Sequence, residues 1–581
     1  MTRAVLSAAI CSALVLSACK SDSPAAPSPV DPIGTPTGPL NVGDIVSLNV
    51  NGTDPCTNPV RRGVKVMAIG THAMIMMDTL NPKNGFTTAD FNRFAARFDT
   101  LVYPIDVGNF GEPTDIDKNG HIGIIFTRAV NELTPPKSAQ YVGGFTFSRD
   151  LFPTVGTARA QACAASNQGE YFYLLAPDPS GTVNSNVRTI GFVDSVTTAV
   201  LAHEFEHLIN ASRRLYVNNT LTFEAKWLDE GLAHVAEELL FYGESGVTPR
   251  SNLDITTLRA NAVSRAAYNA DMSGNQGRYR SYLASPSTSS AYAPNDSLST
   301  RGAVWSLLRY TVDRIDATDG FTAGPGITVS GSGSVTLAPG AAFGDYSLTV
   351  VNTTLQSAAS IGYTLITASA SGDVVPTTLA VRTAPVMTQI PVRTESDGLQ
   401  TDAAFESRLR SRERAVLTPL IASARAWYAT QNMSTPSALR SVSRSLSTQT
   451  DADGALWFRL VNSKDSGAVN LQSLAGGNLA SFVRDWSVSH AVDDVAAPST
   501  QYQQRSWNWH NIYQNVGMGG NAYPLEVQVI SPTTSISGSA VAGGAGFYKL
   551  TISANASVTV TLSTPAGALS TNLQLIVVRT K

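Results

Sequence analysis

The sequence predicts an α+β fold in which a mixed N-terminal part is followed by β-rich segments. Short runs of β-branched and aromatic residues, broken by Gly, Pro and Asn, fill residues 41–152 and are typical of strands. Two later stretches, 201–209 and 226–238, carry apolar residues at helical spacing. At about residue 316 the composition changes to Gly, Ser, Thr and Val with almost no charge, and alternating apolar residues there indicate half-buried strands.

Composition and charge narrow the class of protein. The chain has 581 residues, of which 43% are hydrophobic, and its length suggests about three or four domains. A net charge of −3 and 15% charged residues provide neither a basic surface for nucleic acid nor an acidic tail. We therefore expect a globular protein without a nucleic-acid partner.

The first 40 residues have the pattern of an export signal followed by a linker. An apolar run from Ala4 to Val15 is too short to span a membrane, and Leu16-Ser-Ala-Cys19 resembles a bacterial lipobox. The pattern implies a lipoprotein signal peptide over 1–19 and a lipid anchor on Cys19, with an ordinary cleaved signal as the alternative. Residues 20–40 form a Pro-rich linker. We expect the protein at the bacterial cell envelope, lipid-anchored at the outer membrane or cell surface, or secreted.

Two cysteines remain once the signal has been accounted for. Cys11 leaves with the signal peptide and Cys19 takes the lipid, so Cys56 and Cys163 are left in an oxidising compartment. A Cys56–Cys163 disulfide is therefore predicted, with two free buried thiols as the alternative.

Local patterns place the N-terminal elements. We expect strands over 42–50, 64–69, 122–126 and 171–175, and a helix over 88–99 with its Phe residues on one face.

A short acidic loop precedes the strand at 122–126. Asp115-x-Asp117-x-Asn119-Gly120 begins like a calcium loop, but Phe126 stands at position 12, where such a loop needs a bidentate Glu. We interpret the segment as a turn, with a bound Ca²⁺ as the alternative.

The stretch Leu201-Ala-His-Glu-Phe-Glu-His-Leu-Ile209 carries the chemistry. On a helix, His203 and His207 lie about 40° apart, so both imidazoles can bind one divalent ion. Neutral imidazole favours zinc. Apolar residues form a stripe on the opposite side, and Asp194 and Ser195 are the candidate N-caps.

Glu204 and Glu206 are both candidates for a general base. Each lies about 80° from the histidine pair, on opposite sides, so helical periodicity leaves the choice open. The His-Glu-x-x-His pattern assigns the base to Glu204, which would take a proton from water and pass it to the leaving amine. The alternative is an amphipathic helix with incidental polar residues.

A second predicted helix over 226–238 offers the third metal ligand. Glu230, His234 and Glu237 fall within about 60° of one another on one helix face, so all three are candidate donors.

The two motifs together resemble the gluzincin zinc metallopeptidases. His203-Glu-x-x-His207 followed by Trp227-Leu-Asp-Glu230-Gly-Leu-Ala is similar to their paired zinc motifs, and more narrowly to the hyicolysin-type neutral metallopeptidases of bacteria. The resemblance covers about residues 41–315 and is fainter over 457–513. Its shorter supporting segments are Ala68–His72, Phe98–Pro104, Asp115–Gly120 and Gly143–Pro153.

This resemblance implies a zincin-like domain with Zn²⁺ as cofactor and a protein or peptide substrate. It makes His203, His207 and Glu230 the metal ligands, and it implies a strand edge upstream of the zinc helix that pairs with extended substrate. One position departs from the family pattern, because His234 stands where some gluzincins have an Asp that orients a zinc ligand.

The domain boundaries follow from the resemblance and the composition. We expect a zincin-like catalytic domain over 41–317, an inserted β-sandwich-like module over 318–395, a helical continuation of the catalytic domain over 396–519, and a C-terminal β module over 520–581. Phe547–Thr551 echoes Asp345–Thr349, which indicates either a repeated module or a shared composition.

The leading interpretation is a zinc-dependent endopeptidase with Glu204 as general base. His234 and Tyr242 are candidates to stabilise the oxyanion, whereas His490 and His510 are expected to be structural. One alternative is a non-catalytic surface binding lipoprotein that uses its β modules on a zincin-like scaffold, although the presence of Glu204 argues against it. Another is a zinc hydrolase acting on a non-peptide substrate.

Overall fold

The computed structural model describes most of the chain from residue 39 onward. The described residues are 39–315 without 55, 158, 159, 219, 221, 222 and 294, together with 327–330, 334–355, 360–369, 457, 460, 479–494, 505–515, 522–565 and 572–580. The predicted signal peptide, the anchor at Cys19 and nearly all of the 20–40 linker lie outside them, as does much of 396–519. Among the described helices, none has the length and apolar character needed to span a bilayer.

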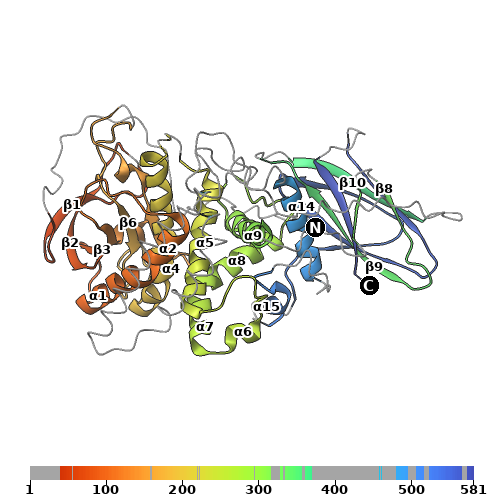
Figure 1. Cartoon of the computed structure of the whole chain (residues 1–581), viewed down its shortest axis with the longest axis horizontal. Coiled ribbons are helices and arrows are strands. Elements are labelled where there is room, and N and C mark those ends of the chain that lie inside the picture. Colours follow the sequence, from red (N-terminus) through yellow and green to blue (C-terminus); the bar gives the residue numbers. More distant parts are fainter. Residues whose placement is uncertain are drawn as a thin grey trace, which may run out of the picture.

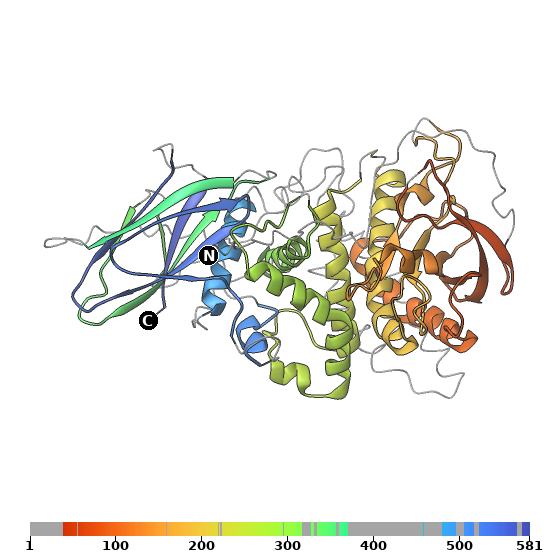
Figure 2. The same cartoon turned by 180° about the vertical axis from the view of Figure 1, so that it is seen from behind.

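The described part is an α+β structure, as predicted. Figures 1 and 2 show a six-stranded sheet at one end, a β-sandwich at the other, and helices between them. The N-terminal sheet has the order β1-β2-β3-β4-β6-β5. Its strands are β1 (Ile45–Asn49), β2 (Arg61–Ile69), β3 (Ala73–Asp78), β4 (Ile122–Thr127), β5 (Gly144–Thr146) and β6 (Tyr171–Leu175).

Within this sheet β3, β4 and β6 are parallel, and β5 runs antiparallel to β6 as an edge strand. The central strands β4 and β6 are buried at every position, as parallel strands covered on both faces require. Alternate residues of β4 enter different cores: Ile124 packs in the same cluster as Phe205, and Ile125 packs in the cluster on the other face.

Helices α1 (Thr88–Arg97), α2 (Tyr103–Phe110) and α4 (Ile190–Tyr216) contribute to the first of these cores. Between α1 and α2 the chain makes a π-helical turn, and the rings of Phe98 and Tyr103 lie 4.9 and 5.4 Å from that of Phe205 on α4. This contact buries the apolar face of α4, and the two histidines lie on the opposite face of the helix.

Helix α4 begins earlier than expected. The hydroxyl of Thr189 accepts the N-cap hydrogen bond from the backbone N–H of Phe192 at 3.2 Å, so Asp194 and Ser195 lie inside the helix and the N-cap prediction is wrong. The start of α4 is largely exposed and lacks the apolar periodicity of a packed helix, so the sequence pattern does not mark where this helix begins.

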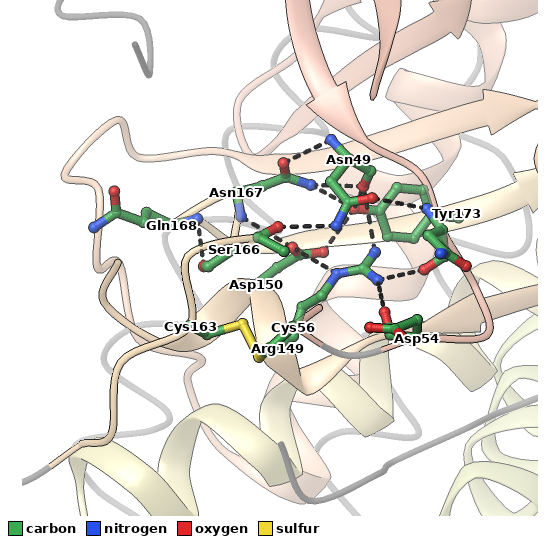
Figure 3. A network of polar contacts seen from close by, with 12 residues as sticks. Asn49, Asp54, Cys56, Arg149, Asp150, Cys163, Ser166, Asn167, Gln168 and Tyr173 are labelled. Atoms are coloured by element: carbon green, nitrogen blue, oxygen red, sulfur yellow. Dashed lines mark hydrogen bonds and ion pairs between the residues drawn. A yellow bond between two sulfur atoms is a disulfide. The ribbon is translucent and has the colours of Figure 1, made fainter. Parts of the chain in front are cut away.

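A disulfide and a buried polar network hold the loops around β5 (Figure 3). The predicted Cys56–Cys163 disulfide is confirmed, with the two Cα atoms 5.3 Å apart. The fully buried guanidinium of Arg149 donates to the backbone carbonyl of Asp54 at 2.9 Å, and Tyr173 donates to Asp150 at 2.6 Å. Because Arg149 and Asp150 lie in the short helical turn just after β5, the network anchors one end of this edge strand.

Most of the other helices form the middle of the molecule. They are α5 (Lys226–Ser245), α6 (Ile255–Arg259), α7 (Ala262–Ala267), α8 (Ser273–Leu283), α9 (Leu298–Ile315), α14 (Leu479–Asp494) and α15 (Trp509–Asn515), while the short α3 (Arg128–Leu133) follows β4. The buried carboxylate of Glu238 accepts hydrogen bonds from Arg309 at 3.0 Å and from Trp507 at 2.7 Å. Residues 505–515 therefore pack on α5, the helix that carries Glu230.

The two β-rich segments form one sandwich. Its sheets have the orders β12-β10-β14-β8 and β11-β13-β9-β15-β7, so each sheet contains strands from both 327–369 and 528–579. The sequence prediction of two separate modules, at 318–395 and 520–581, is corrected to a single sandwich. The strands are β7 (Ile327–Ser330), β8 (Ser334–Leu337), β9 (Gly344–Asn352), β10 (Ser360–Ser369), β11 (Gln528–Ile530), β12 (Thr534–Val541), β13 (Ala545–Ile552), β14 (Val558–Ser563) and β15 (Leu573–Arg579).

The echoing segments 345–349 and 547–551 are neighbours in this sandwich. They lie in β9 and β13, which pair antiparallel with Asp345 opposite Thr551 and Thr349 opposite Phe547. Paired strands that share the same faces require the same alternation of apolar and polar residues, which accounts for the likeness.

Candidate active site

Helices α4 and α5 bring together the residues of the two motifs. His203 and His207 lie on α4 and Glu230 lies on α5, and all three side chains are buried. Glu230 Oε2 is 3.7 Å from His203 Nε2 and 3.9 Å from His207 Nε2, and one ligand atom from each residue lies within 4.8 Å of the others. Three donors from two helices therefore converge on one point.

This arrangement fits a bound metal ion. His207 Nε2 and Glu230 Oε2 are buried and find no hydrogen-bond partner among the described residues. Because zinc bonds to nitrogen and oxygen are about 2.0–2.2 Å long, one ion can bridge atoms that are just under 4 Å apart after small side-chain adjustments. Two imidazoles and one carboxylate are a donor set that catalytic zinc uses, and three protein ligands leave a position for water.

Two neighbouring carboxylates position the candidate histidine ligands. Glu237 Oε1 lies 2.8 Å from His203 Nδ1, and Asp229 Oδ2 lies 3.2 Å from His207 Nδ1. Each contact directs the other ring nitrogen, Nε2, toward Glu230.

Glu230 itself is held by Arg301 of α9, whose Nη2 donates to Glu230 Oε1 at 2.8 Å. Sequence reasoning missed the positioning roles of Asp229, Glu237 and Arg301. The sequence carries a signal for both carboxylates: Asp229 directly precedes Glu230, and Glu237 lies on the same helix face as Glu230.

The carboxylates around the imidazoles also change their protonation. Burial alone would lower the pKa of His203, but hydrogen bonds with Glu230 and Glu237 raise that pKa to about 9. Burial likewise opposes the charged form of His207, and the Asp229 carboxylate raises its pKa. Both shifts favour the protonated rings, whereas a metal ion binds the neutral imidazole.

An open cleft of about 460 Å³ leads to this site. Its lining includes His203 and Glu204, together with Gly143 and Gly144 at the edge strand β5. A Cβ atom on Gly144 would lie 3.0 Å from Glu204 Oε1, so the absence of a side chain lets β5 lie directly against this carboxylate. The remaining lining residues are Ala139, Gln140, Tyr141, Val200, Glu237, Ser273, Gly274, Gly277, Arg278, Ser281, Leu298 and Arg301.

The second candidate base lies on the other side of α4. Glu206 is fully buried, is not among the described residues that line the cleft, and has Asp229 and Asp106 nearby. Burial first, and then these carboxylates, raise the pKa of Glu206 well above its usual value, which favours the neutral acid over the carboxylate that a general base requires. The geometry therefore favours Glu204 over Glu206.

The residues suggested for oxyanion stabilisation do not reach the cleft. His234 is completely buried, its Nδ1 lies 3.2 Å from the acceptor Glu237 Oε1, and it is absent from the described lining. Tyr242 is completely buried and donates to Glu238 at 3.0 Å. Both are corrected to packing positions, because His234 lies behind His203 and Tyr242 lies about 18 Å along α5 from Glu230.

The two C-terminal histidines have structural contacts. His490 is buried and shares a 2.9 Å hydrogen bond with the Tyr279 hydroxyl, and His510 Nδ1 lies 2.5 Å from the backbone carbonyl of Asp493. Neither is among the described residues of the cleft lining.

Two buried imidazoles and a buried carboxylate, one of them (His203) in the wall of an open cleft beside a sheet edge, form a candidate metal centre. A sequence comparison points to the metallopeptidase class: over 156 residues the chain is 27% identical to the neutral metalloprotease ShpI of Staphylococcus hyicus. The match covers 27% of this chain and 32% of that protein, so it spans about a third of the relative's length. No family model matches the chain.

Proposed function

We propose that this chain is a zinc-dependent endopeptidase with a zincin-like catalytic domain. His203, His207 and Glu230 would hold the zinc ion. The observation that carries the proposal is the convergence of these three donors on one point, with His203 and Glu204 both lining the adjacent cleft. The partial similarity to a neutral metalloprotease supports it.

A zinc ion held by these residues would act as a Lewis acid that activates water and polarises the substrate carbonyl. Glu204 takes the proton from the attacking water and delivers it to the leaving amine nitrogen. Thr146 of β5 donates a hydrogen bond to the backbone carbonyl of Glu204 at 2.7 Å, which fixes the position of the edge strand relative to the proposed base.

The substrate would bind along β5. This strand is an edge of the sheet, and its first residue Gly144 lines the cleft together with the preceding Gly143, so an extended peptide can pair with its open side.

Tyr141 and Arg278 are the cleft residues best suited to stabilise the developing oxyanion. Both line the cleft, and both can donate hydrogen bonds there. Burial raises the pKa of Tyr141, so its hydroxyl keeps the proton at neutral pH.

The experiment that tests the proposal compares Glu204→Gln with Glu206→Gln. Both variants remove one charge from the same helix, but only Glu204 lines the cleft. We expect about one zinc per chain in both, and a loss of casein cleavage by a factor of about 10²–10⁴ only in Glu204→Gln. Equal loss in both variants, or loss in Glu206→Gln alone, would contradict the assignment of the base.

A second candidate function is a non-catalytic binding protein on the same scaffold. Zinc binding without cleavage of any protein substrate by the wild-type chain would favour it. In either case we propose that a lipid on Cys19 tethers the protein at the cell envelope, on the strength of the lipobox-like sequence at residues 16–19.

A further inference from the structure

A second group of acidic residues lies in the N-terminal domain, at the loop between α2 and β4. One carboxylate oxygen from each of Asp115, Asp117 and Glu170 lies within 4.8 Å of the others. Asp115 and Asp117 belong to the loop and are exposed, whereas Glu170 immediately precedes β6 and is only 2% exposed. Residues more than 50 positions apart in sequence thus face one another.

Glu170 has an oxygen that points to a missing partner. Its Oε1 accepts a hydrogen bond from the backbone N–H of Ile116 at 2.9 Å, but its Oε2 is buried and finds no hydrogen-bond partner in the described part of the chain. A buried carboxylate oxygen without a partner is costly, unless a cation or an ordered water satisfies it.

The charge of the group is also uncompensated. Within the described ranges, no Lys, Arg or His forms an ion pair with any of the three carboxylates. Burial, followed by the neighbouring Asp117 and Asp115, raises the pKa of Glu170 to about 8. When all three groups are ionised they repel one another, and the described part of the chain supplies no counter-charge there.

The backbone leaves room beside the carboxylates. A Cβ atom on Gly169 would lie 2.9 Å from Asp117 Oδ2, so a larger residue before Glu170 would push into the group. Lys118 and Gly120 have positive φ values of 59° and 71°, which bend the loop so that Asp115 and Asp117 both face Glu170.

We propose that Asp115, Asp117 and Glu170 bind a Ca²⁺ ion. Oxygen donors with several carboxylates suit this ion, which takes six to eight ligands and completes its shell with water or backbone carbonyls. Glu170 supplies the acidic ligand that the loop lacks at Phe126. It is distant from the loop in sequence, and the fold brings its side chain beside the loop.

The position of this site links it to the helix that carries the histidines. The backbone N–H of Thr114 donates to Ser212 at 3.3 Å, and Arg213 donates to the carbonyl of Glu112 at 2.6 Å. Ser212 and Arg213 are on α4, a turn and a half beyond His207. The ion would brace the loop, the start of β6 and the end of α4 together, and would stabilise the domain without taking part in hydrolysis.

The test is thermal unfolding of the zinc-loaded full chain in calcium-free buffer, with CaCl₂ added stepwise. At a tenfold excess over the Kd we expect the Tm to rise by about 3–6 °C. The same titration with MgCl₂ should give a smaller rise in Tm. Mg²⁺ requires a near-ideal octahedral set of ligands, whereas this site offers flexible carboxylates. A wild-type Tm that stays constant up to about 10 mM Ca²⁺, well above the weak range of extracellular sites, would overturn the proposal.

Glu170→Gln separates ion binding from a packing role. It should abolish the calcium-dependent rise, and in calcium-free buffer above pH 8, where Glu170 is ionised, its Tm should equal or exceed that of the wild type, because one repelling charge is gone. A Tm lowered equally with and without calcium would instead show that Glu170 only packs, and would refute the site. Asp117→Asn, at an exposed position, should also lose the rise, while Glu526→Gln, an exposed residue of another domain, should keep it.

Terbium luminescence gives an independent readout. The Tyr171 ring lies beside Gly169 and Asp117, close enough to sensitise a bound Tb³⁺ ion. We expect tyrosine-excited Tb³⁺ emission in the wild type that Ca²⁺ displaces and that Glu170→Gln lacks. Emission that is unchanged in that variant would place the ion elsewhere and contradict the proposal.

Discussion

Glu237 offers a way to weaken the proposed zinc site without removing a ligand. Its Oε1 lies 2.8 Å from His203 Nδ1 and 3.2 Å from His234 Nδ1, and its side chain is 10% exposed. The carboxylate fixes the orientation of the His203 ring and makes it a better donor to a metal ion.

The expected loss depends on what replaces the carboxylate. Partners of this kind contribute about 10- to 100-fold in metal affinity, or about 1.4–2.8 kcal/mol. Glu237→Gln keeps an acceptor oxygen for the His203 N–H and loses only the charge, so we expect about a tenfold weaker zinc affinity. Glu237→Ala also leaves that buried N–H without its acceptor, so the loss should approach 100-fold.

Competition with a fluorescent zinc chelator measures these affinities. Glu244→Gln is the matched control, because Glu244 lies two turns further along α5 and contacts Arg97 instead of a histidine. Zinc affinities of both Glu237 variants within twofold of the wild type would refute the positioning role, as would an equal loss in the control.

Three further predictions follow from the contacts described above. Replacing Cys56 and Cys163 by Ser opens a loop of 107 residues, and urea unfolding should show a loss of about 4–5 kcal/mol; an unchanged midpoint would contradict this. Arg301→Met leaves Glu230 without its guanidinium partner, so chelator competition should show weaker zinc binding, and unaltered affinity would mean that Arg301 does not orient the ligand. Burial lowers the pKa of His490 to about 3, so the unfolded chain binds a proton that the folded chain rejects, and stability falls as the pH drops from about 6.5 toward 3. His490→Gln should make this decline in Tm shallower, and an identical pH profile would show that other groups cause it.

The parts of the site that depend on local spacing could be predicted from the sequence. His203 and His207 are separated by one helical turn, so their common direction follows from helix geometry alone. The contacts that orient them could not be predicted in the same way, because Asp229, Glu237 and Arg301 reach the histidines and Glu230 only once α4, α5 and α9 are packed together.

The limits of local patterns are clearest in the β-rich segments. Alternation along 347–351 and 363–367 predicts strands, and both segments form strands, but alternation carries no information about which strands pair. The partners of β9 and β10 lie more than 150 residues away, so two modules were expected where one sandwich forms.

Tyr242 shows a different error. The twelve positions that separate it from Glu230 correspond to about three and a third helical turns, which puts it on another face as well as far along α5. Helix geometry alone would have excluded it from the cleft.

The most direct test of the central claim is anomalous X-ray scattering from crystals of the zinc-loaded chain, measured on both sides of the zinc absorption edge. We predict one strong peak about 2.0–2.2 Å from His203 Nε2, His207 Nε2 and a carboxylate oxygen of Glu230. A peak among His203, His234 and Glu237 instead, or the lack of any peak between α4 and α5, would contradict the proposed metal centre and the mechanism that depends on it.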